Sequence, residues 1–241
     1  MSGHSHWASI KHKKGAADAK RSKVFSKLAR EITVAAREGG GDTTFNSKLR
    51  MVVDKAKALN MPADNVDRAI KKGTGEIEGE QLEPIIIEAY GPGGISLIIE
   101  GITDNKNRTL GEIKKTLNEN NGKMVAEGAI KWMFDRKGVI EINIAKCAKT
   151  KEDLEMAAIE AGAADILWNE EVMEIQTNPE NLEKVRKTLE DAGIMAEGAA
   201  LSWIAKENIK LSEKENESCQ KLFEALDEND AVQEIYSNTQ I

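Results

Sequence analysis

The sequence predicts an α+β protein of three domains: an N-terminal three-helix bundle and two α/β domains, one inserted in the other, with the inserted one in a ferredoxin-like βαββαβ order. Three observations predict it. The spacing of apolar residues is helical before residue 73 and strand-like after residue 84, a Gly- and Glu-rich stretch separates the two patterns, and strand and helix patterns then alternate. The predicted boundaries are 1–75 for the basic helical domain with a flexible N-terminal arm, 76–134 with 206–241 for the middle domain, and 135–205 for the insert.

Three helices are predicted in the first domain. The first covers 18–38, and its apolar residues fall within an arc of about 100° when each residue turns the helix by about 100°: Val24, Phe25, Leu28, Ile32 and Ala35. The segment "GGGD" ends it, because glycine readily adopts the left-handed backbone of a helix end. The second helix covers 46–59, and the third begins near Pro62 and ends at Gly73.

The linker is predicted at 73–84, where Gly and Glu dominate. Residues 84–102 then indicate two strands around the turn "GPGG", 103–120 a helix, and 128–144 a strand-like segment. Thr103 or Asp104 is expected to cap the helix.

The insert is predicted from the order of elements in residues 137–205. The pattern gives strands at 139–144, 165–168, 172–177 and 195–203, with helices at 152–161 and 179–192. The tail adds a helix at 212–226 and a strand at 232–236, which are too little to fold alone. We therefore expect the tail to complete the middle domain. Trp132 and Trp203, in "AIKW" and "ALSW" on either side of the insert, are expected in the core or at a hinge.

Charge is segregated along the chain. The whole protein has a net formal charge of −7, yet its first 75 residues contain 16 Lys and Arg against 7 Asp and Glu. A basic segment joined to an acidic remainder favours a polyanionic partner. The alternative is a domain whose surface is merely rich in Lys. On the first predicted helix, 18–38, the basic residues share the side opposite the apolar one and are called here the basic stripe: Lys20, Lys23, Lys27, Arg30 and Arg37.

Several classes of function are disfavoured by what the sequence lacks. Its apolar runs are too short for a membrane span, and no secretory signal is recognised. Cys147 and Cys219 lie far apart without Cys or His companions, which indicates reduced thiols and a cytoplasmic protein. We find no GxSxG, HExxH, P-loop or strand-linked GxGxxG motif, so an enzyme, a cofactor and a small-molecule substrate are not expected. The histidines of the arm lack a Cys or carboxylate cluster, which disfavours a metal site.

The predicted nucleic-acid-binding residues belong to the arm and the first helix, where ammonium groups would pair with phosphates and imidazole or indole rings would stack on bases. They are His4, His6, Trp7, Lys11, His12, Lys13, Lys14, Lys20, Arg21, Lys23, Lys27, Arg30 and Arg37. In "TDNKNRT", Asn105, Asn107 and Arg108 lie beside a helix N-terminus, where they could receive an anion in addition to the capping role.

These segments carry a resemblance to a known family. The matching stretches are "GHSHWASIKHKKGAADAKR", "KLAREITVAAREGGGD", "KAKALNMPADNVDRAIKKGTGE", "AYGPGG", "TDNKNRT" and "WMFDRKGVI". They resemble the YebC/PmpR family of probable transcriptional regulatory proteins, which includes the mitochondrial translational activator of cytochrome c oxidase. The resemblance implies three domains and a basic N-terminal segment that binds nucleic acid. The sequence departs from the expected pattern at "NNGKMVAEGAI", residues 120–130.

The resemblance implies two roles: DNA-binding transcriptional regulation, or action on the ribosome that eases elongation through difficult, proline-rich sequences. The basic helix bears mostly Lys, which contacts the phosphate backbone. Proteins that recognise a sequence in the major groove instead use Arg, Asn and Gln to hydrogen-bond to base edges. The acidic remainder would also be repelled by duplex DNA. We therefore expect a non-enzymatic, ribosome-associated translation factor that contacts rRNA or tRNA. The alternatives are a DNA-binding transcriptional regulator and a protein-binding scaffold.

Overall fold

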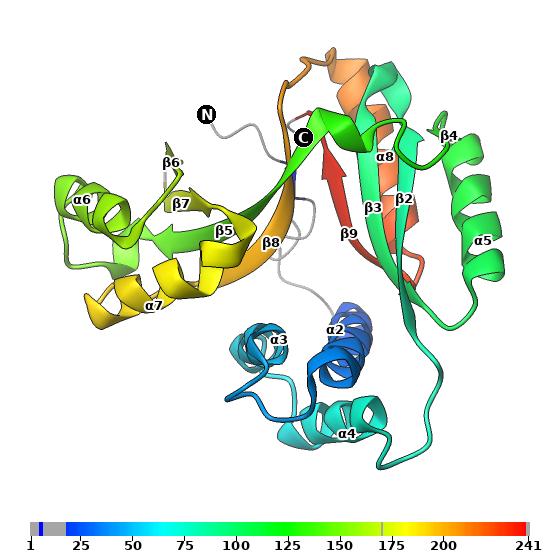
Figure 1. Ribbon diagram of the computed structural model, residues 1–241. Coiled ribbons are helices and arrows are strands. Elements are labelled where there is room, and N and C mark those ends of the chain that lie inside the picture. Colours follow the sequence, from blue (N-terminus) through cyan, green and yellow to red (C-terminus); the bar gives the residue numbers. More distant parts are fainter. Residues whose placement is uncertain (1–4, 7–17, 170, 240–241) are drawn as a thin grey trace. The chain divides into compact units, whose positions relative to one another are not determined.

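The computed structural model describes residues 5–6, 18–169 and 171–239 (Figure 1). These residues form two compact units. One is Phe134–Lys206, and the other combines the described residues up to Met133 with those from Glu207 onward. None of the described helices has the length and apolar character needed to cross a membrane.

Three helices open the larger unit: α2 (Asp18–Gly39), α3 (Ser47–Ala58) and α4 (Ala63–Thr74). Asn46 caps α3 by accepting a hydrogen bond from the N–H of Leu49, and Gly75 ends α4 in the left-handed conformation, with φ of 81°. The apolar side of α2 packs on the other two helices as predicted. The buried residues of this core are Leu28, Ile32, Ala35, Ala36, Leu49, Val53, Ala56, Met61, Val66 and Ala69.

An antiparallel sheet follows in the same unit, with strand order β1-β9-β3-β2-β4. Its strands are β1 (Ser5–His6), β2 (Glu83–Tyr90), β3 (Ser96–Thr103), β4 (Lys123–Met124) and β9 (Val232–Ser237). The predicted hairpin joins β2 to β3 through Pro92–Gly94, where Gly93 and Gly94 have φ of 68° and 77°. Strand β9 comes from the C-terminal segment and pairs with β3, so the segments before and after the smaller unit share one sheet.

Helices α5 (Lys106–Glu119) and α8 (Glu213–Asp227) supply the core that covers this sheet. Their buried apolar residues form a single cluster with those of β2, β3 and β9, which includes Ile87, Leu97, Ile113, Leu117, Leu222 and Phe223. Ser212 opens α8 with a capping box, in which its side chain and that of Glu215 exchange hydrogen bonds with each other's backbone N–H.

The second unit contains β5 (Phe134–Asn143), α6 (Lys151–Ala161), β6 (Asp165–Trp168), β7 (Val172–Thr177), α7 (Leu182–Asp191) and β8 (Gly198–Ala205). Its antiparallel sheet has the order β6-β7-β5-β8, which is the ferredoxin-like arrangement of a βαββαβ chain. Ile140, Ile175, Leu154 and Leu189 are buried from its strands and helices. The protein is therefore an α+β multidomain protein, as predicted.

Candidate nucleic-acid interface

Much of the predicted arm lies outside the described residues: His4, Trp7, Lys11, His12, Lys13 and Lys14. The backbones of two further predicted residues are placed, His6 in β1 and Lys20 in α2. Strand β1 pairs with β9, with Ser5 opposite Ser237. At this point the predicted flexible arm has a short piece of regular structure.

The basic stripe of α2 is not an open face along its length. Lys23 Nζ lies 3.1 Å from Glu228 Oε2, and Lys27 Nζ lies 2.8 Å from Asp227 Oδ1. These acidic residues stand at the end of α8. The stripe is therefore partly neutralised by residues about 200 positions away in the sequence.

Arg30 continues this contact. Its Nη1 donates to the carbonyl oxygens of Ile102 and Asp230, each at 3.2 Å. Beside it, Val34 of α2 joins Leu82 and Ile102 in a small buried apolar cluster. Apolar and charged contacts together thus attach α2 to the β3 and β9 region. Arg37, at one end of the stripe, is exposed, and so is Arg21 beside its other end.

The Lys27–Asp227 pair is shielded from solvent. The two side chains are 12% and 14% exposed, and Lys27 also donates to the Asp227 carbonyl at 3.3 Å. Burial lowers the pKa of Lys27, although Asp227 acts in the opposite direction. Lys27 is therefore paired with a specific carboxylate and has lost part of its hydration. A lysine that binds phosphate would instead be solvated before its ligand arrives.

Breaking this pair is expected to destabilise the protein. We expect Asp227→Ala to lower the free energy of unfolding by about 1–3 kcal/mol, because it leaves the largely buried Lys27 ammonium without its carboxylate. A double-mutant cycle with Lys27→Met, followed by urea unfolding, measures the coupling. Lys115 and Glu119, 3.8 Å apart and well exposed, provide the control, with an expected coupling of at most about 0.5 kcal/mol. Equal couplings for the two pairs would contradict the contact described above.

A second ionic contact involves a residue that the sequence did not single out. Lys55 of α3 lies 3.3 Å from Glu234 Oε1 of β9 and 3.7 Å from Glu31 Oε2 of α2. The carboxylates raise the pKa of Lys55, Glu31 first, against the opposing effect of burial. Nearby in the same sheet, Tyr236 donates its hydroxyl to Glu100 Oε2 at 3.3 Å. A helical wheel could not reveal the contact of Lys55, since its two carboxylates, Glu31 and Glu234, come from distant segments.

The predicted anion site beside α5 is occupied by the protein's own groups. Asn105, and not Thr103 or Asp104, is the cap, and its side chain accepts from the Arg108 N–H at 3.1 Å. The Arg108 guanidinium pairs with Asp104, and its Nε lies 3.8 Å from Glu112 Oε1. Thr103 instead accepts from the Asn105 N–H at 2.9 Å.

Asn107 is exposed and takes no part in these contacts. The capping interpretation accounts for Asn105 and Arg108 without a ligand. Binding of an anion by this loop remains a prediction.

The two tryptophans differ in their surroundings. Trp132 is 67% exposed, and its Nε1 donates to the Ala129 carbonyl at 2.9 Å. Of the two places predicted for it, the core is wrong and the hinge stays a prediction. Trp132 lies two residues before Phe134, where the smaller unit begins. Trp203 is half-buried, with the Arg136 guanidinium 5.0 Å from its ring centroid.

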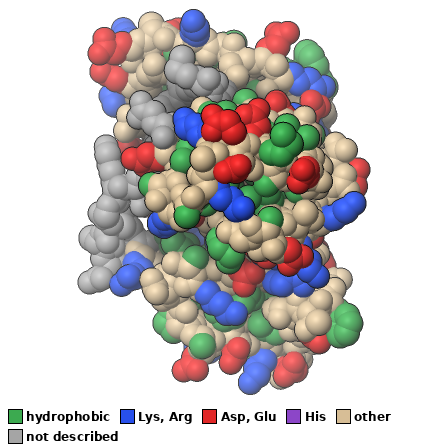
Figure 2. All heavy atoms as spheres, turned by 90° about the vertical axis from the view of Figure 1, so that its left-hand side faces the viewer, with side chains coloured by type: hydrophobic (Ala, Val, Ile, Leu, Met, Phe, Trp, Pro, Cys, Tyr) green, Lys and Arg blue, Asp and Glu red, His purple; other side chains and the backbone are tan. Residues whose placement is uncertain are grey.

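The described surface offers no group of three or more His, Cys, Asp or Glu side chains placed to hold a metal ion. On the face shown in Figure 2, basic and acidic side chains lie interspersed. Cys219 is buried, and burial raises the pKa of its thiol to about 11. That thiol donates to the Pro92 carbonyl at 3.4 Å, which is a structural contact.

Comparison with known proteins agrees with the resemblance noted in the sequence. The family model described as the TACO1/YebC protein N-terminal domain matches residues 5–76, and the one described as the TACO1/YebC second and third domain matches 82–239. A protein of Geobacter sulfurreducens is 50% identical over all of this chain and 96% of its own length. One of Thermotoga maritima is 49% identical over 99% of this chain and 93% of its own.

Both relatives are named "Probable transcriptional regulatory protein". A crystal structure of a conserved hypothetical protein from Aquifex aeolicus is 43% identical and superposes with a TM-score of 0.88, covering 96% of this chain and 95% of that one. Sequence similarity therefore extends through both compact units and is matched by similarity of fold. The chain belongs to the TACO1/YebC family.

Proposed function

We propose that this chain is a non-enzymatic, nucleic-acid-binding regulator of gene expression, and that its N-terminal segment makes the contact. One observation carries the proposal: the first 75 residues hold 16 basic and 7 acidic residues in a chain whose net charge is −7. Phosphate backbones bind such a segment through release of counterions. Both candidate roles below place the protein in the cytoplasm.

The first candidate role is regulation of transcription through DNA. The names of the relatives support it, because the Geobacter and Thermotoga proteins are both named as probable transcriptional regulatory proteins. Neither of these two names refers to a ribosomal or RNA partner. DNA is therefore the partner that the similarities favour.

The second candidate role is that of a ribosome-associated translation factor, and a specific observation favours it. Lys23, Lys27 and Arg30 contact the protein's own acidic and carbonyl groups, so α2 lacks a continuous exposed basic face to lay in a major groove. Recognition of irregular RNA needs no such face, since it depends on scattered phosphate contacts and stacking. An rRNA or tRNA partner is consistent with this geometry.

Sedimentation with crosslinking separates the two roles. A lysate is irradiated, fractionated on a sucrose gradient and probed for this protein, and the attached nucleic acid is sequenced. Recovery at discrete chromosomal sites, with the protein at the top of the gradient, is the result expected of the transcriptional role. Co-sedimentation with ribosomal particles and crosslinks to rRNA would establish the translational role. A protein that crosslinks to neither would overturn the proposal.

The basic segment itself can be tested by removing four of its charges together. The quadruple alanine variant changes Lys13, Lys14, Lys20 and Arg21. We expect weaker binding to any nucleic acid. The slope of log affinity against log salt should fall by roughly three, at about 0.7–0.9 for each phosphate that the variant no longer neutralises.

The control for this test removes the same charge elsewhere. It changes Lys114, Lys115, Lys149 and Lys214, all outside the N-terminal segment. Equally weakened binding in the two quadruple variants would show that only net charge matters. If the slope of log affinity against log salt is unchanged in the N-terminal variant, the assignment of binding to this segment is wrong.

A further inference from the structure

Phe45 is the most exposed large hydrophobic side chain among the described residues. It is 87% exposed, in the loop that joins α2 to α3, whereas Trp132 and Met195 are each 67% exposed. An aromatic ring in water adds nothing to the core and carries a solvation cost. Single exposed apolar residues are common on proteins, so the surroundings of this one decide its meaning.

The loop that presents Phe45 is held in place by the neighbouring Asn46. The buried Asn46 side chain donates to the carbonyls of Ala35 and Gly40, each at 2.8 Å, and accepts from Leu49 N–H at 3.0 Å. All three of these hydrogen bonds are directed inward and fix the chain at this point. The residue beside it consequently projects from a well-anchored support.

Two further contacts fix the same loop. Asp42 accepts from the N–H of Thr44 at 2.7 Å through its side chain and from that of Phe45 at 3.3 Å through its carbonyl. Arg50 reaches back from α3 and donates to the Thr43 carbonyl at 2.9 Å. A preorganised loop of this kind loses little conformational entropy when a partner binds.

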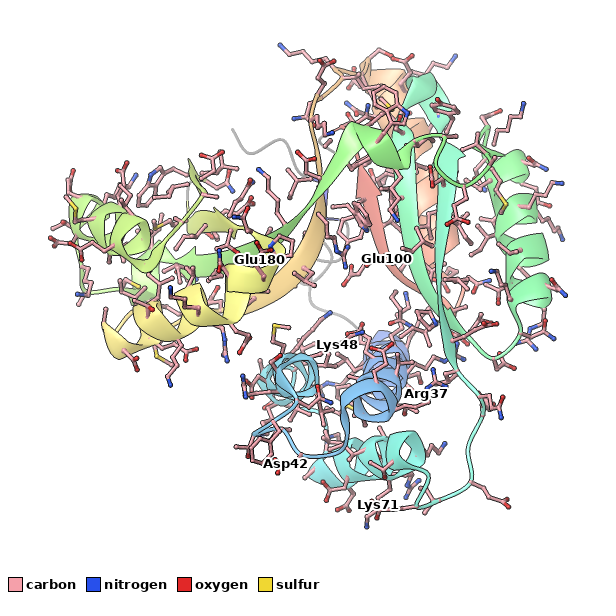
Figure 3. The ribbon with its side chains drawn as sticks, in the orientation of Figure 1. Arg37, Asp42, Lys48, Lys71, Glu100 and Glu180 are labelled. Carbon is pink, nitrogen blue, oxygen red and sulfur yellow. The ribbon has the colours of Figure 1, made fainter. Side chains whose placement is uncertain are left out.

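Basic side chains surround this end of the helical bundle. Arg37 lies in the last turn of α2, Lys48 in the first turn of α3, and Lys71 and Lys72 in the last turn of α4. All four are exposed. Figure 3 labels three of them, Arg37, Lys48 and Lys71, on the bundle.

These three helix ends meet at the loop. A methyl group added to Gly41 would lie 3.0 Å from side-chain atoms of Ile70 and Thr74, which places the loop against the last turns of α4. Carboxylates share the region. Glu38 pairs with Lys48 at 2.6 Å, and Asp42 accepts from the Thr44 N–H. Asp64 and Asp67 line one hollow with Lys71 and Arg68. Arg37, Lys71 and Lys72 are the exposed cations at these helix ends that a phosphate chain would meet.

We propose that Phe45 is a stacking platform for an unpaired nucleobase, and that Arg37, Lys71 and Lys72 hold the adjoining phosphates. An exposed aromatic ring beside spaced cations is the arrangement by which proteins bind single strands without reading a sequence. Bases of a closed duplex are already stacked, so the ligand is a single-stranded or looped segment. The inference rests on the proposed nucleic-acid-binding function and locates a second contact for it, away from the N-terminal arm.

Three substitutions of Phe45 separate stacking from simple apolar contact. The probes are fluorescein-labelled twelve-residue oligouridine and oligothymidine, and the measurement is fluorescence anisotropy with the full chain. Phe45→Ala is expected to weaken binding about tenfold, within the range for removal of one stacked base. Phe45→Leu, which keeps the apolar surface, is expected to weaken it nearly as much. Phe45→Trp is expected to bind as tightly as the parent protein.

Because Phe45 is so exposed, these variants are expected to keep the fold, and Met195→Ala, at an exposed site of the other unit, is the matched control. Irradiation with 5-bromouridine RNA, or bromodeoxyuridine DNA, should yield a crosslinked peptide containing residue 45. The probe that binds more tightly identifies RNA or DNA as the source of the base.

The possible failures are distinguishable. If the parent protein binds neither probe nor a structured RNA or duplex DNA, the proposed function itself fails. Binding by the parent that Phe45→Ala leaves unchanged overturns only the stacking platform. Binding by Phe45→Leu equal to that of the parent also overturns it, since an apolar contact, such as one with a protein, would then suffice.

Discussion

Replacing Glu88 with alanine is expected to lower the free energy of unfolding by about 3 kcal/mol. Glu88 lies on β2 and is 3% exposed. Its Oε1 accepts from the Gly128 N–H at 2.6 Å, and its Oε2 accepts from the N–H groups of Ile130 and Lys131 at 2.6 and 2.9 Å. Alanine would leave three backbone donors without an acceptor, one of them in the fully buried Ile130. Urea unfolding followed by circular dichroism measures the change.

The same carboxylate should make stability depend on pH. Burial alone would raise the pKa of Glu88, but the three N–H donors outweigh it and hold the pKa below its usual value. The folded protein therefore binds this proton less tightly than the unfolded chain does. The stabilisation is complete above the unfolded pKa of about 4.3 and is lost as pH falls through the lower folded value.

Glu88→Gln isolates this pH dependence. The free energy of unfolding of this variant is expected to be lower than that of the parent protein at pH 7. The difference is expected to shrink below about pH 4, near the unfolded pKa of the carboxyl. Glu83→Ala is the control, since Glu83 is an exposed carboxylate on the same strand and should change stability by less than about 0.5 kcal/mol. A deficit for Glu88→Gln that stays constant with pH would rule out a stabilising carboxylate at this position.

Glu88 also illustrates what the sequence could not predict. In "PIIIEAY" the alternation places Ile85, Ile87 and Ala89 on the buried side, and Glu88 on the side of Ile86, which is 46% exposed. An alternating pattern therefore assigns Glu88 to solvent. Its burial depends on the loop that includes Gly128, whose N–H donates to Glu88 Oε1. No local pattern reports that a loop 40 residues away will fold over a strand.

Local chemistry does predict where most elements lie. The second helix is expected to begin at Asn46, which is its cap, and the strand 165–168 has the predicted bounds. Such signals are carried by residues that act on the neighbouring backbone, so they can be read before any tertiary contact is known. The two-residue strands β1 and β4 have no such signal, because a pair of residues shows no period.

The basic stripe of α2 shows that a local pattern also fails to predict the tertiary contacts of the functional site. Helical spacing places Lys23, Lys27 and Arg30 on one side of α2, and the structure agrees that they avoid the helical core. The period of a helix says which residues share a face, but not what covers that face. Here the cover is the acidic end of α8, whose Asp227 and Glu228 belong to the acidic remainder that was expected to repel duplex DNA.

Gly73→Ala is expected to lower the free energy of unfolding of the helical part by about 1–3 kcal/mol, the cost of overpacking a tight contact. Gly73 lies in α4 where that helix touches α2. A Cβ atom there would stand 2.4 Å from the Thr33 carbonyl oxygen and 2.7 Å from the Ala36 Cβ. The first of these is backbone, which cannot move aside as a flexible side chain would, so α2 and α4 must separate. Thr33 Oγ1 also donates to the Ala69 carbonyl at 3.1 Å, and this hydrogen bond would lengthen.

Gly111→Ala makes the matched comparison, because the same change in another helix should have the opposite sign. Gly111 lies inside α5, is exposed, and has nothing within 4 Å of the position of a new Cβ. Alanine there should stabilise by about 0.5–1 kcal/mol, through the lower entropy of the unfolded chain. Hydrogen exchange measured peptide by peptide assigns each change to its helix. If both variants stabilise, α2 and α4 are not packed through Gly73. If both destabilise, helix propensity does not govern the exposed surface of α5.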